Sequence, residues 1–259
     1  MIATARTGHS VTSGGVVDAR HAERFYGVTK GGAPLPRYYR GGFEMAHIIS
    51  GARFSISYLI MGPIENNVYI IGDGETTFVV DPTCDADRIV QELGGRALDS
   101  IVLTHAHWDH CGAAKALRDA TGARVIASEV DAPIITGERK LEAGHKAFTP
   151  CPIDRPVSDG EVLGIGAMRW KVLVTPGHTP GSMCLFHDAS EEGEGAPVLV
   201  SGDTLFAGAH GRTDFVGGDP AAMRESLTRL AALPDATIVL PGHNNPTTIA
   251  REKRWLPLP

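Results

Sequence analysis

Four short apolar segments of this chain each run directly into a loop that carries histidine or aspartate. The longest loop follows the apolar run 101–103 and reads THAHWDHCG at residues 104–112. The others read TPGH at 175–178, SGD at 201–203 and PGH at 241–243, and each has a glycine directly before its histidine or aspartate. Loops at the ends of buried strands are where open α/β architectures gather their sites. The chain must therefore adopt a fold that gathers four strand ends, with glycines allowing close approach of the backbone.

The remaining pattern predicts a mixed fold. Short β-branched or aromatic runs predict strands at 54–60, 67–71, 77–80, 124–126, 170–174, 182–186, 198–200 and 237–240. Helical spacing predicts helices at 85–93, 110–120, 220–230 and 247–255, with Asp219 as the N-cap of the third and Pro220 at its first position. An antiparallel meander followed twice by alternating strands and helices indicates an α/β (α+β) protein. We expect two mixed sheets packed together with helices outside.

Composition excludes several classes of protein. The 259 residues are 42% hydrophobic and 21% charged, which is ordinary for a globular protein that buries a large core. A formal charge of −6 gives no bulk attraction to nucleic acid or to anionic lipid, so neither is expected as a partner. The sequence has no apolar leader and no run of about 18 apolar residues, and its four cysteines form no CxxC pair. We therefore expect a cytoplasmic protein without membrane contact.

Residues 1–45 differ from the rest of the chain and are predicted to form an N-terminal extension, with the main domain at 46–259. The stretch GVTKGGAPLPRYYRGG at 27–42 is rich in glycine and proline and has neither helical nor strand periodicity. We interpret it as an extended arm. Tyr38 and Tyr39 would anchor it to the main body or to another subunit, and the second would make the protein a homo-oligomer. The alternative is a loosely packed extension.

Seven side chains at these strand ends predict a metal centre. Imidazole and carboxylate donors without thiolate suit zinc, iron or manganese better than calcium or magnesium. One catalytic ion needs three protein ligands and an open position, so seven exceed its needs, and two ions that share a carboxylate would use all of them. A water held between two ions would act as a nucleophile near neutral pH, with the ions stabilising the oxyanion formed at a carbonyl. The predicted ligands are His105, His107, Asp109, His110, His178, Asp203 and His243.

The motifs THAHWDH, TPGHTPGS, SGDTLF and PGH, in this order, resemble those of the metallo-β-lactamase superfamily over residues 50–259. The resemblance implies a four-layer αββα sandwich with two divalent metals, zinc first among them, between the sheets. It implies that His105, His107 and His178 bind the first metal and that Asp109, His110 and His243 bind the second. Asp203 would bridge the metals and, with Asp109, serve catalysis. Asp81 has two alternative roles, an acidic residue that orients the site or a turn former at a strand end.

Within the superfamily, GDTLFAGAHGRTDFVGGD and LPGHNNPTTIAREK are most similar to the glyoxalase II-like hydrolases, which cleave thioesters of the hydroxyacylglutathione type. The chain ends soon after TTIAREK and so resembles the compact members. The expected activity is hydrolysis of a small-molecule thioester or related ester by a metal-bridging hydroxide. The main alternative is a persulfide dioxygenase, which shares GRTDF and would bind one iron through His105, His178 and Asp203. A lactonase and a non-catalytic binding module are further alternatives, whereas Asp203 argues against a β-lactamase.

Three further positions have open interpretations. Trp108 either walls the pocket or packs in the core, and Cys111 either touches the metal or is a small residue at a helix start. Arg212 and Asp214 are predicted to form a charge-assisted pair that fixes the loop after Asp203.

Overall fold

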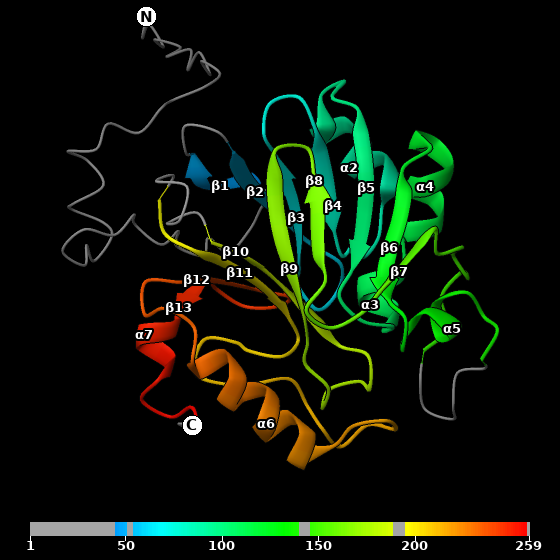
Figure 1. Ribbon diagram of the computed structural model, residues 1–259. Helices are drawn as coiled ribbons and strands as arrows, with labels where there is room; N and C mark the ends of the chain where they lie inside the picture. Colours follow the sequence, from blue (N-terminus) through cyan, green and yellow to red (C-terminus); the bar gives the residue numbers. More distant parts are fainter. Residues whose placement is uncertain (1–44, 51–53, 140–145, 189–194, 258–259) are drawn as a thin grey trace, which may run out of the picture. The chain divides into compact units, whose positions relative to one another are not determined.

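Two β-sheets form the centre of the protein (Figure 1). The computed structural model describes residues 54–139, 146–188 and 195–257, and the backbone alone of 45–50, all within the unit from Leu35 to Pro259. The first sheet has the order β1-β2-β3-β4-β5-β6-β7, antiparallel up to β4 and parallel from there on. Its strands are β1 (Met45–Ser50), β2 (Ser55–Met61), β3 (Asn66–Gly72), β4 (Thr77–Val80), β5 (Leu98–Leu103), β6 (Arg124–Ser128) and β7 (Arg155–Val157).

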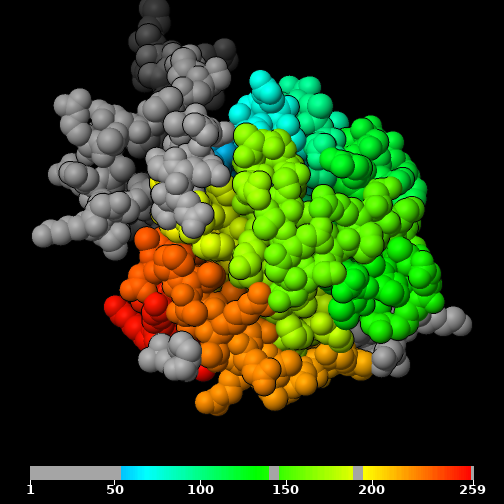
Figure 2. Space-filling model, in the orientation of Figure 1, coloured from blue at the N-terminus to red at the C-terminus, as the bar shows by residue number. Residues whose placement is uncertain are grey.

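The second sheet has the order β13-β12-β11-β10-β9-β8, and β11 with β12 is its one parallel pair among the described residues. Its strands are β8 (Val162–Ile165), β9 (Met168–Val174), β10 (Met183–His187), β11 (Val198–Gly202), β12 (Ile238–Pro241) and β13 (Thr247–Thr248). Figure 2 shows the segment around β8 and β9, in yellow-green, between green residues that precede it in the sequence and orange residues near α6 (Pro220–Ala231).

Three apolar layers separate four layers of secondary structure. The middle layer lies between the sheets and takes buried side chains from both, among them Phe78 of β4 and Trp170 of β9, whose rings meet edge to face at 5.6 Å. The second layer lies between the first sheet and the helices α2 (Ala86–Leu93), α3 (Trp108–Cys111), α4 (Ala114–Thr121) and α5 (Ala132–Ile135). The third lies between the second sheet and the helices α6 and α7 (Ile249–Glu252). This αββα arrangement confirms the predicted fold class.

Most predicted strands and the helices at 85–93 and 220–230 are confirmed within one or two residues. The Asp219 side chain caps α6 by accepting hydrogen bonds from the backbone N–H groups of Ala221 and Ala222, and Pro220 occupies the first helical position. The Gly72–Gly74 turn also joins two antiparallel strands as predicted. These elements have strong local signals, namely alternating apolar residues and a capping aspartate.

The predicted continuous helix at 110–120 is wrong. It divides into α3 and α4 with Gly112 between them. A Cβ atom at Gly112 would lie 2.1 Å from the carbonyl oxygen of Thr83, so the backbone of this residue packs directly against the loop after β4. That close approach is a tertiary contact, and no helical periodicity signals it.

The predicted helix at 247–255 is also wrong in its bounds, because strand β13 precedes α7, which covers only Ile249–Glu252. Thr248 caps this helix by accepting a hydrogen bond from the backbone N–H of Arg251. Besides β13, the short strands β1, β7 and β8 and the helix α5 were not predicted, because segments of three to six residues carry little periodicity.

The proposed N-terminal arm lies outside the described residues, except for Met45 at the start of β1, and its role and boundary remain predictions. Among the described helices, none has the length and apolar content needed to cross a bilayer.

Candidate metal centre

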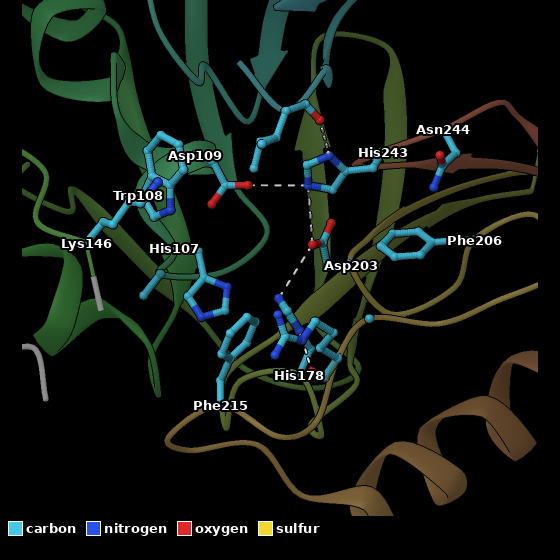
Figure 3. A pocket seen from close by; sticks show the side chains of 14 residues that line it. His107, Trp108, Asp109, Lys146, His178, Asp203, Phe206, Phe215, His243 and Asn244 are labelled. Carbon is cyan, nitrogen blue, oxygen red and sulfur yellow. Dashed lines mark hydrogen bonds and ion pairs between the residues drawn. The ribbon is translucent and has the colours of Figure 1, made fainter. Parts of the chain in front are cut away.

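The four predicted loops meet at one edge of the sandwich, where β5, β9, β11 and β12 end (Figure 3). A glycine precedes the site residue in three of them and allows the close packing. A Cβ atom at Gly242 would lie 2.4 Å from Asp203 Oδ1 and 2.7 Å from His110 Cε1, and Gly202 adopts a left-handed φ of 49°. The predicted use of glycine at these strand ends is therefore confirmed.

The first ligand group consists of His105, His107 and His178. The first two follow β5 of the first sheet, whereas His178 follows β9 of the second sheet. Their ring centroids lie 4.5–4.8 Å apart in pairs and meet edge to face. One nitrogen of each ring lies within 4.8 Å of the corresponding atoms of the other two, so the three can hold one cation together.

The second ligand group consists of Asp109, His110 and His243. Asp109 and His110 lie in the short helix α3, and His243 follows β12. Asp109 Oδ2 lies 3.4 Å from His110 Nε2 and 3.3 Å from His243 Nε2. Here too, ligand atoms from both sheets converge.

Asp203 lies between the two groups. Its Oδ2 is 3.5 Å from Nε2 of both His178 and His243, and its Oδ1 is 3.4 Å from His110 Nε2. Asp203 is 8% exposed, so the protein covers most of its surface. The structure thus brings together all seven predicted residues.

Buried atoms without partners show that this donor set fits a metal. Three of them, His105 Nε2, His178 Nε2 and Asp203 Oδ1, make no hydrogen bond although each is inaccessible to solvent. A buried polar atom of this kind costs about 1–3 kcal/mol unless something satisfies it. Imidazole nitrogen and carboxylate oxygen are ligands that zinc, iron and manganese accept.

The outer nitrogens of the histidines are held by the protein, which turns Nε2 inward. His178 Nδ1 lies 2.7 Å from the carbonyl oxygen of Arg212, and His243 Nδ1 lies 3.2 Å from that of Ile64. Each nitrogen can donate to its carbonyl, which fixes the tautomer and orientation of the ring.

Asp81 orients two further histidines from the end of β4. Its Oδ2 lies 2.8 Å from His110 Nδ1 and accepts a hydrogen bond from Thr104 Oγ1 at 2.6 Å. Thr104 Oγ1 in turn lies 3.0 Å from His105 Nδ1. Asp81 adopts a left-handed φ of 53°, which is uncommon for a residue with a side chain and fits a position fixed by its contacts. Of its two predicted roles, these contacts support the orienting one.

Two residues near the ligands were not predicted. Asn66 Nδ2 donates to Asp109 Oδ2 at 3.0 Å and lies 3.4 and 3.3 Å from Nε2 of His110 and His243. Asp131 accepts hydrogen bonds from the loops that carry His105, His107 and His178. Asn66 opens an ordinary strand and Asp131 follows another, and the sequence around them contains no motif that marks a site.

Burial and charge set the protonation of the two groups in opposite directions. Burial, together with neighbouring histidines, lowers the pKa of His105 well below its usual value and that of His107 to about 3. Burial acts in the same sense on His110, but the carboxylates of Asp203 and Asp81 outweigh it and raise the pKa well above the usual value. For Asp203, burial opposes ionisation, yet the charge of His110 lowers its pKa to about 2.

The family model of the metallo-β-lactamase superfamily matches residues 61–243, which is more than half of the chain and includes all seven site residues. The chain belongs to the metallo-β-lactamase superfamily. The predicted resemblance is thereby confirmed, and the matched region contains the histidine and aspartate groups that could hold metal ions.

Two curated relatives of this metallo-β-lactamase-fold protein align over nearly their whole length. The chain is 31% identical over 214 residues to the hydroxyacylglutathione hydrolase GloC of Haemophilus influenzae, covering 78% of this chain and 97% of that protein. It is 31% identical over 199 residues to the probable metallo-hydrolase YqgX of Bacillus subtilis, covering 74% and 92%.

Three solved structures share the fold at similar levels of identity. The BLEG-1 B3 metallo-β-lactamase is 34% identical, with a TM-score of 0.66 and coverage of 78% of this chain and 98% of that one. TTHA1623 in a di-iron-bound form is 33% identical, with a TM-score of 0.66 and coverage of 77% and 98%. ETHE1 from Myxococcus xanthus is 30% identical, with a TM-score of 0.63 and coverage of 78% and 83%. These three proteins share the fold but carry different names, and a shared fold does not determine the reaction, which depends on the site.

A pocket of about 570 Å³ opens onto the site, and aromatic side chains form part of its wall. Trp108, Phe206 and Phe215 line it, with Lys146 Nζ 4.2 Å from the centroid of the Trp108 ring (Figure 3). Trp108 therefore lines the pocket, which is the first of its two predicted roles. Cys111 instead lies in the apolar layer under the first sheet, and its thiol donates to the carbonyl oxygen of His105 at 3.2 Å.

The predicted pair at the pocket rim is present. Arg212 donates two hydrogen bonds to Asp214, at 2.8 and 2.7 Å, and its guanidinium lies 4.2 Å from the centroid of the Phe215 ring. Both side chains of the pair are 65% exposed.

Proposed function

We propose that this protein is a di-metal hydrolase that cleaves a thioester of the hydroxyacylglutathione type or a related ester. One observation carries the proposal: a single oxygen of Asp203 lies 3.5 Å from a histidine of each ligand group. A carboxylate placed in this way suits a ligand shared by two cations. Zinc is the proposed metal, and iron or manganese would meet the same donor set.

The aspartates and the histidines would have different roles at such a centre. When bound, two divalent cations would activate a water molecule and polarise the carbonyl group that it attacks. Asp109 and Asp203 supply negative charge to hold the cations, and the neutral imidazoles of His105 and His107 supply nitrogen donors. Their low pKa values, caused first by burial, keep these two rings unprotonated at neutral pH.

The pocket wall would position the substrate above this centre. Trp108 and Phe215 present apolar faces beside His107, whose ring centroid lies 5.7 Å from that of Phe215. Such faces would contact the acyl or thiol group and reduce the access of bulk water to the carbonyl. Cys111, which directly follows His110, lies buried in the apolar layer and does not face the pocket as a nucleophile would.

The similarity to GloC supports a thioester substrate, because that relative is named a hydroxyacylglutathione hydrolase. The test is release of thiol from a hydroxyacylglutathione thioester, with the metal content of the same preparation measured in parallel. We expect two metal ions per chain and hydrolysis that a chelator abolishes and added zinc restores. Asp203→Ala should abolish turnover, whereas Asp99→Ala, which breaks an exposed ion pair with Arg124, should leave it unchanged. Full activity of Asp203→Ala would contradict the mechanism.

A second candidate, a mono-iron persulfide dioxygenase, is favoured by the identity of the unpartnered atoms. They belong to His105, His178 and Asp203, a set of two histidines and one carboxylate of the kind that holds non-haem iron. The similarity to the ETHE1 structure points the same way. One iron per chain and oxygen uptake with a glutathione persulfide, without thioester hydrolysis, would favour this reaction. A lactone and a β-lactam complete the substrate panel, the latter because of the similarity to BLEG-1.

A further inference from the structure

One buried carboxylate that is no predicted ligand joins the two chain segments that carry the first ligand group. Asp131 follows β6, directly before α5, and its relative exposure is 0%. Its Oδ2 accepts hydrogen bonds from the backbone N–H of Ala106 at 2.9 Å and from Thr179 Oγ1 at 2.8 Å. Its Oδ1 accepts a hydrogen bond from the backbone N–H of Gly181 at 2.9 Å.

These donors lie next to all three histidines of the first group. Ala106 stands between His105 and His107, and Thr179 directly follows His178. The first segment belongs to the first sheet and the second to the other sheet, so the carboxylate bridges the two halves of the fold.

The surroundings of Asp131 are built for this contact. Ser128 Oγ donates to the carbonyl oxygen of Gly181 at 2.6 Å and accepts from the backbone N–H of Asp131 at 3.2 Å. A Cβ atom at Gly181 would lie 2.5 Å from Asp131 Oδ1, so only glycine lets the second segment come this close. A buried carboxylate is costly unless it is well hydrogen-bonded, and here both oxygens have donors.

The second group has no such contact with Asp131. Its residues are oriented instead by Asn66 and Asp81, through Asp109 Oδ2 and His110 Nδ1. Asp81 also reaches the first group, through Thr104 and His105 Nδ1, whereas the hydrogen bonds of Asp131 with the ligand loops are all with the first group.

We propose that Asp131 is a positioning residue for the first metal group, setting the distance between the loop of His105 and His107 and the loop of His178. The inference rests on metal binding at the proposed centre. Residues that orient metal ligands through hydrogen bonds typically change metal affinity by about 10- to 100-fold when they are replaced. Asp131 should act on the first group alone.

The test measures zinc affinity, by competition with a chromophoric chelator, in two backgrounds that each leave one group intact. His243→Ala disables the second group, and His178→Ala disables the first. In the His243→Ala background, adding Asp131→Asn should weaken zinc binding by about 10- to 100-fold. In the His178→Ala background, the same substitution should leave the affinity unchanged. Equal losses in both backgrounds, or no loss in the first, would overturn the proposal.

Asp154→Asn provides a matched control. This carboxylate also lies beside β6 and accepts a backbone hydrogen bond, from Val125 at 2.8 Å, but its other partner is Arg118 and not a ligand loop. It should not change zinc affinity in either background.

If Asp131→Asn does not fold, Thr179→Val tests the same contact, since it removes one donor to Oδ2 and keeps the carboxylate. A smaller loss of zinc affinity confined to the His243→Ala background is then expected, and its absence would count against the proposal. Failure of the proposed function has a different signature, because the wild-type chain would then bind no metal or hydrolyse no thioester.

Discussion

The two ligand groups differ in how the protein itself partners their inward-facing atoms. In the first group, Nε2 of His105 and of His178 has no hydrogen-bond partner. In the second, Asp109 Oδ2 accepts a hydrogen bond from Asn66 and lies within 3.4 Å of Nε2 of both His110 and His243. The first group therefore depends on a cation to satisfy buried atoms. In the second group, protonated His110 and His243 and the amide of Asn66 provide partners for Asp109 without a metal ion.

The largest expected effect of this difference is on metal-linked stability. Zinc at 1,000-fold above its dissociation constant should raise the free energy of unfolding by about 4 kcal/mol. His178→Ala should remove more of this gain than His243→Ala, because a cation at the second group must displace protons and the amide contact of Asn66. Chemical denaturation with zinc and with chelator measures both values. A larger loss for His243→Ala would reverse the comparison.

The pH dependence of the metal-free protein should also separate the groups. Burial lowers the pKa of His105 and of His107, the latter to about 3. Below pH 6.5 these two histidines are therefore protonated in the unfolded chain but not in the folded chain. Stability should fall with decreasing pH by about 1.4 kcal/mol per pH unit for each of these residues. The window runs from about pH 6.5 towards pH 3.

The second group should have the opposite sign. Burial lowers the pKa of His110 and His243, but carboxylate contacts outweigh it and raise both above the usual value. Their contribution is present below pH 6.5 and is lost as the pH rises through the raised pKa values. The test is the free energy of unfolding of the metal-free protein as a function of pH. His107→Gln should reduce the pH dependence on the acid side, and His243→Gln should reduce it on the alkaline side. Unchanged profiles would contradict the assignment.

A smaller effect is expected from Asn66→Ala in the metal-free protein. It removes the donor to Asp109 Oδ2, which should cost about 1–3 kcal/mol of unfolding free energy. Ser57→Ala is a suitable control, since this buried hydroxyl donates to the carbonyl oxygen of Ile70 and contacts no ligand. If zinc affinity in the His243→Ala background also fell on replacing Asn66, the two groups would not be independent.

The smallest effect is expected at the pocket rim. Arg212→Ala combined with Asp214→Ala should leave the free energy of unfolding almost unchanged, because both side chains are 65% exposed and water screens the pair. Thermal unfolding of the double variant checks this. A loss comparable to that of Asn66→Ala would mean that the loop after Asp203 depends on its surface charges.

The sequence predicts those parts of the site whose residues lie together in a short motif. The ligand positions stand in short motifs at strand ends, and the structure brings all seven together at one edge of the sandwich. Asn66 and Asp131 were missed because their partners are distant in sequence. Asn66 meets His243 across 177 residues, and Asp131 meets Gly181 across 50. Such pairings depend on how the sheets pack.

The same reason explains the errors in the helices. Gly112 interrupts the predicted helix because its backbone packs on Thr83, and β13 replaces the first residues of the last helix because it pairs with β12. Both are tertiary effects that override local propensity.

The long sequence separations within each ligand group bear on the kinetics of folding. Each group takes residues from both sheets, so it exists only after the two sheets have docked. We expect this docking to follow the folding transition state, so a cation bound at either group should act mainly on the rate of unfolding. Metal should lengthen the lifetime of the folded chain without speeding its formation, so that metal loss exposes the protein to proteolysis long before its folding is impaired.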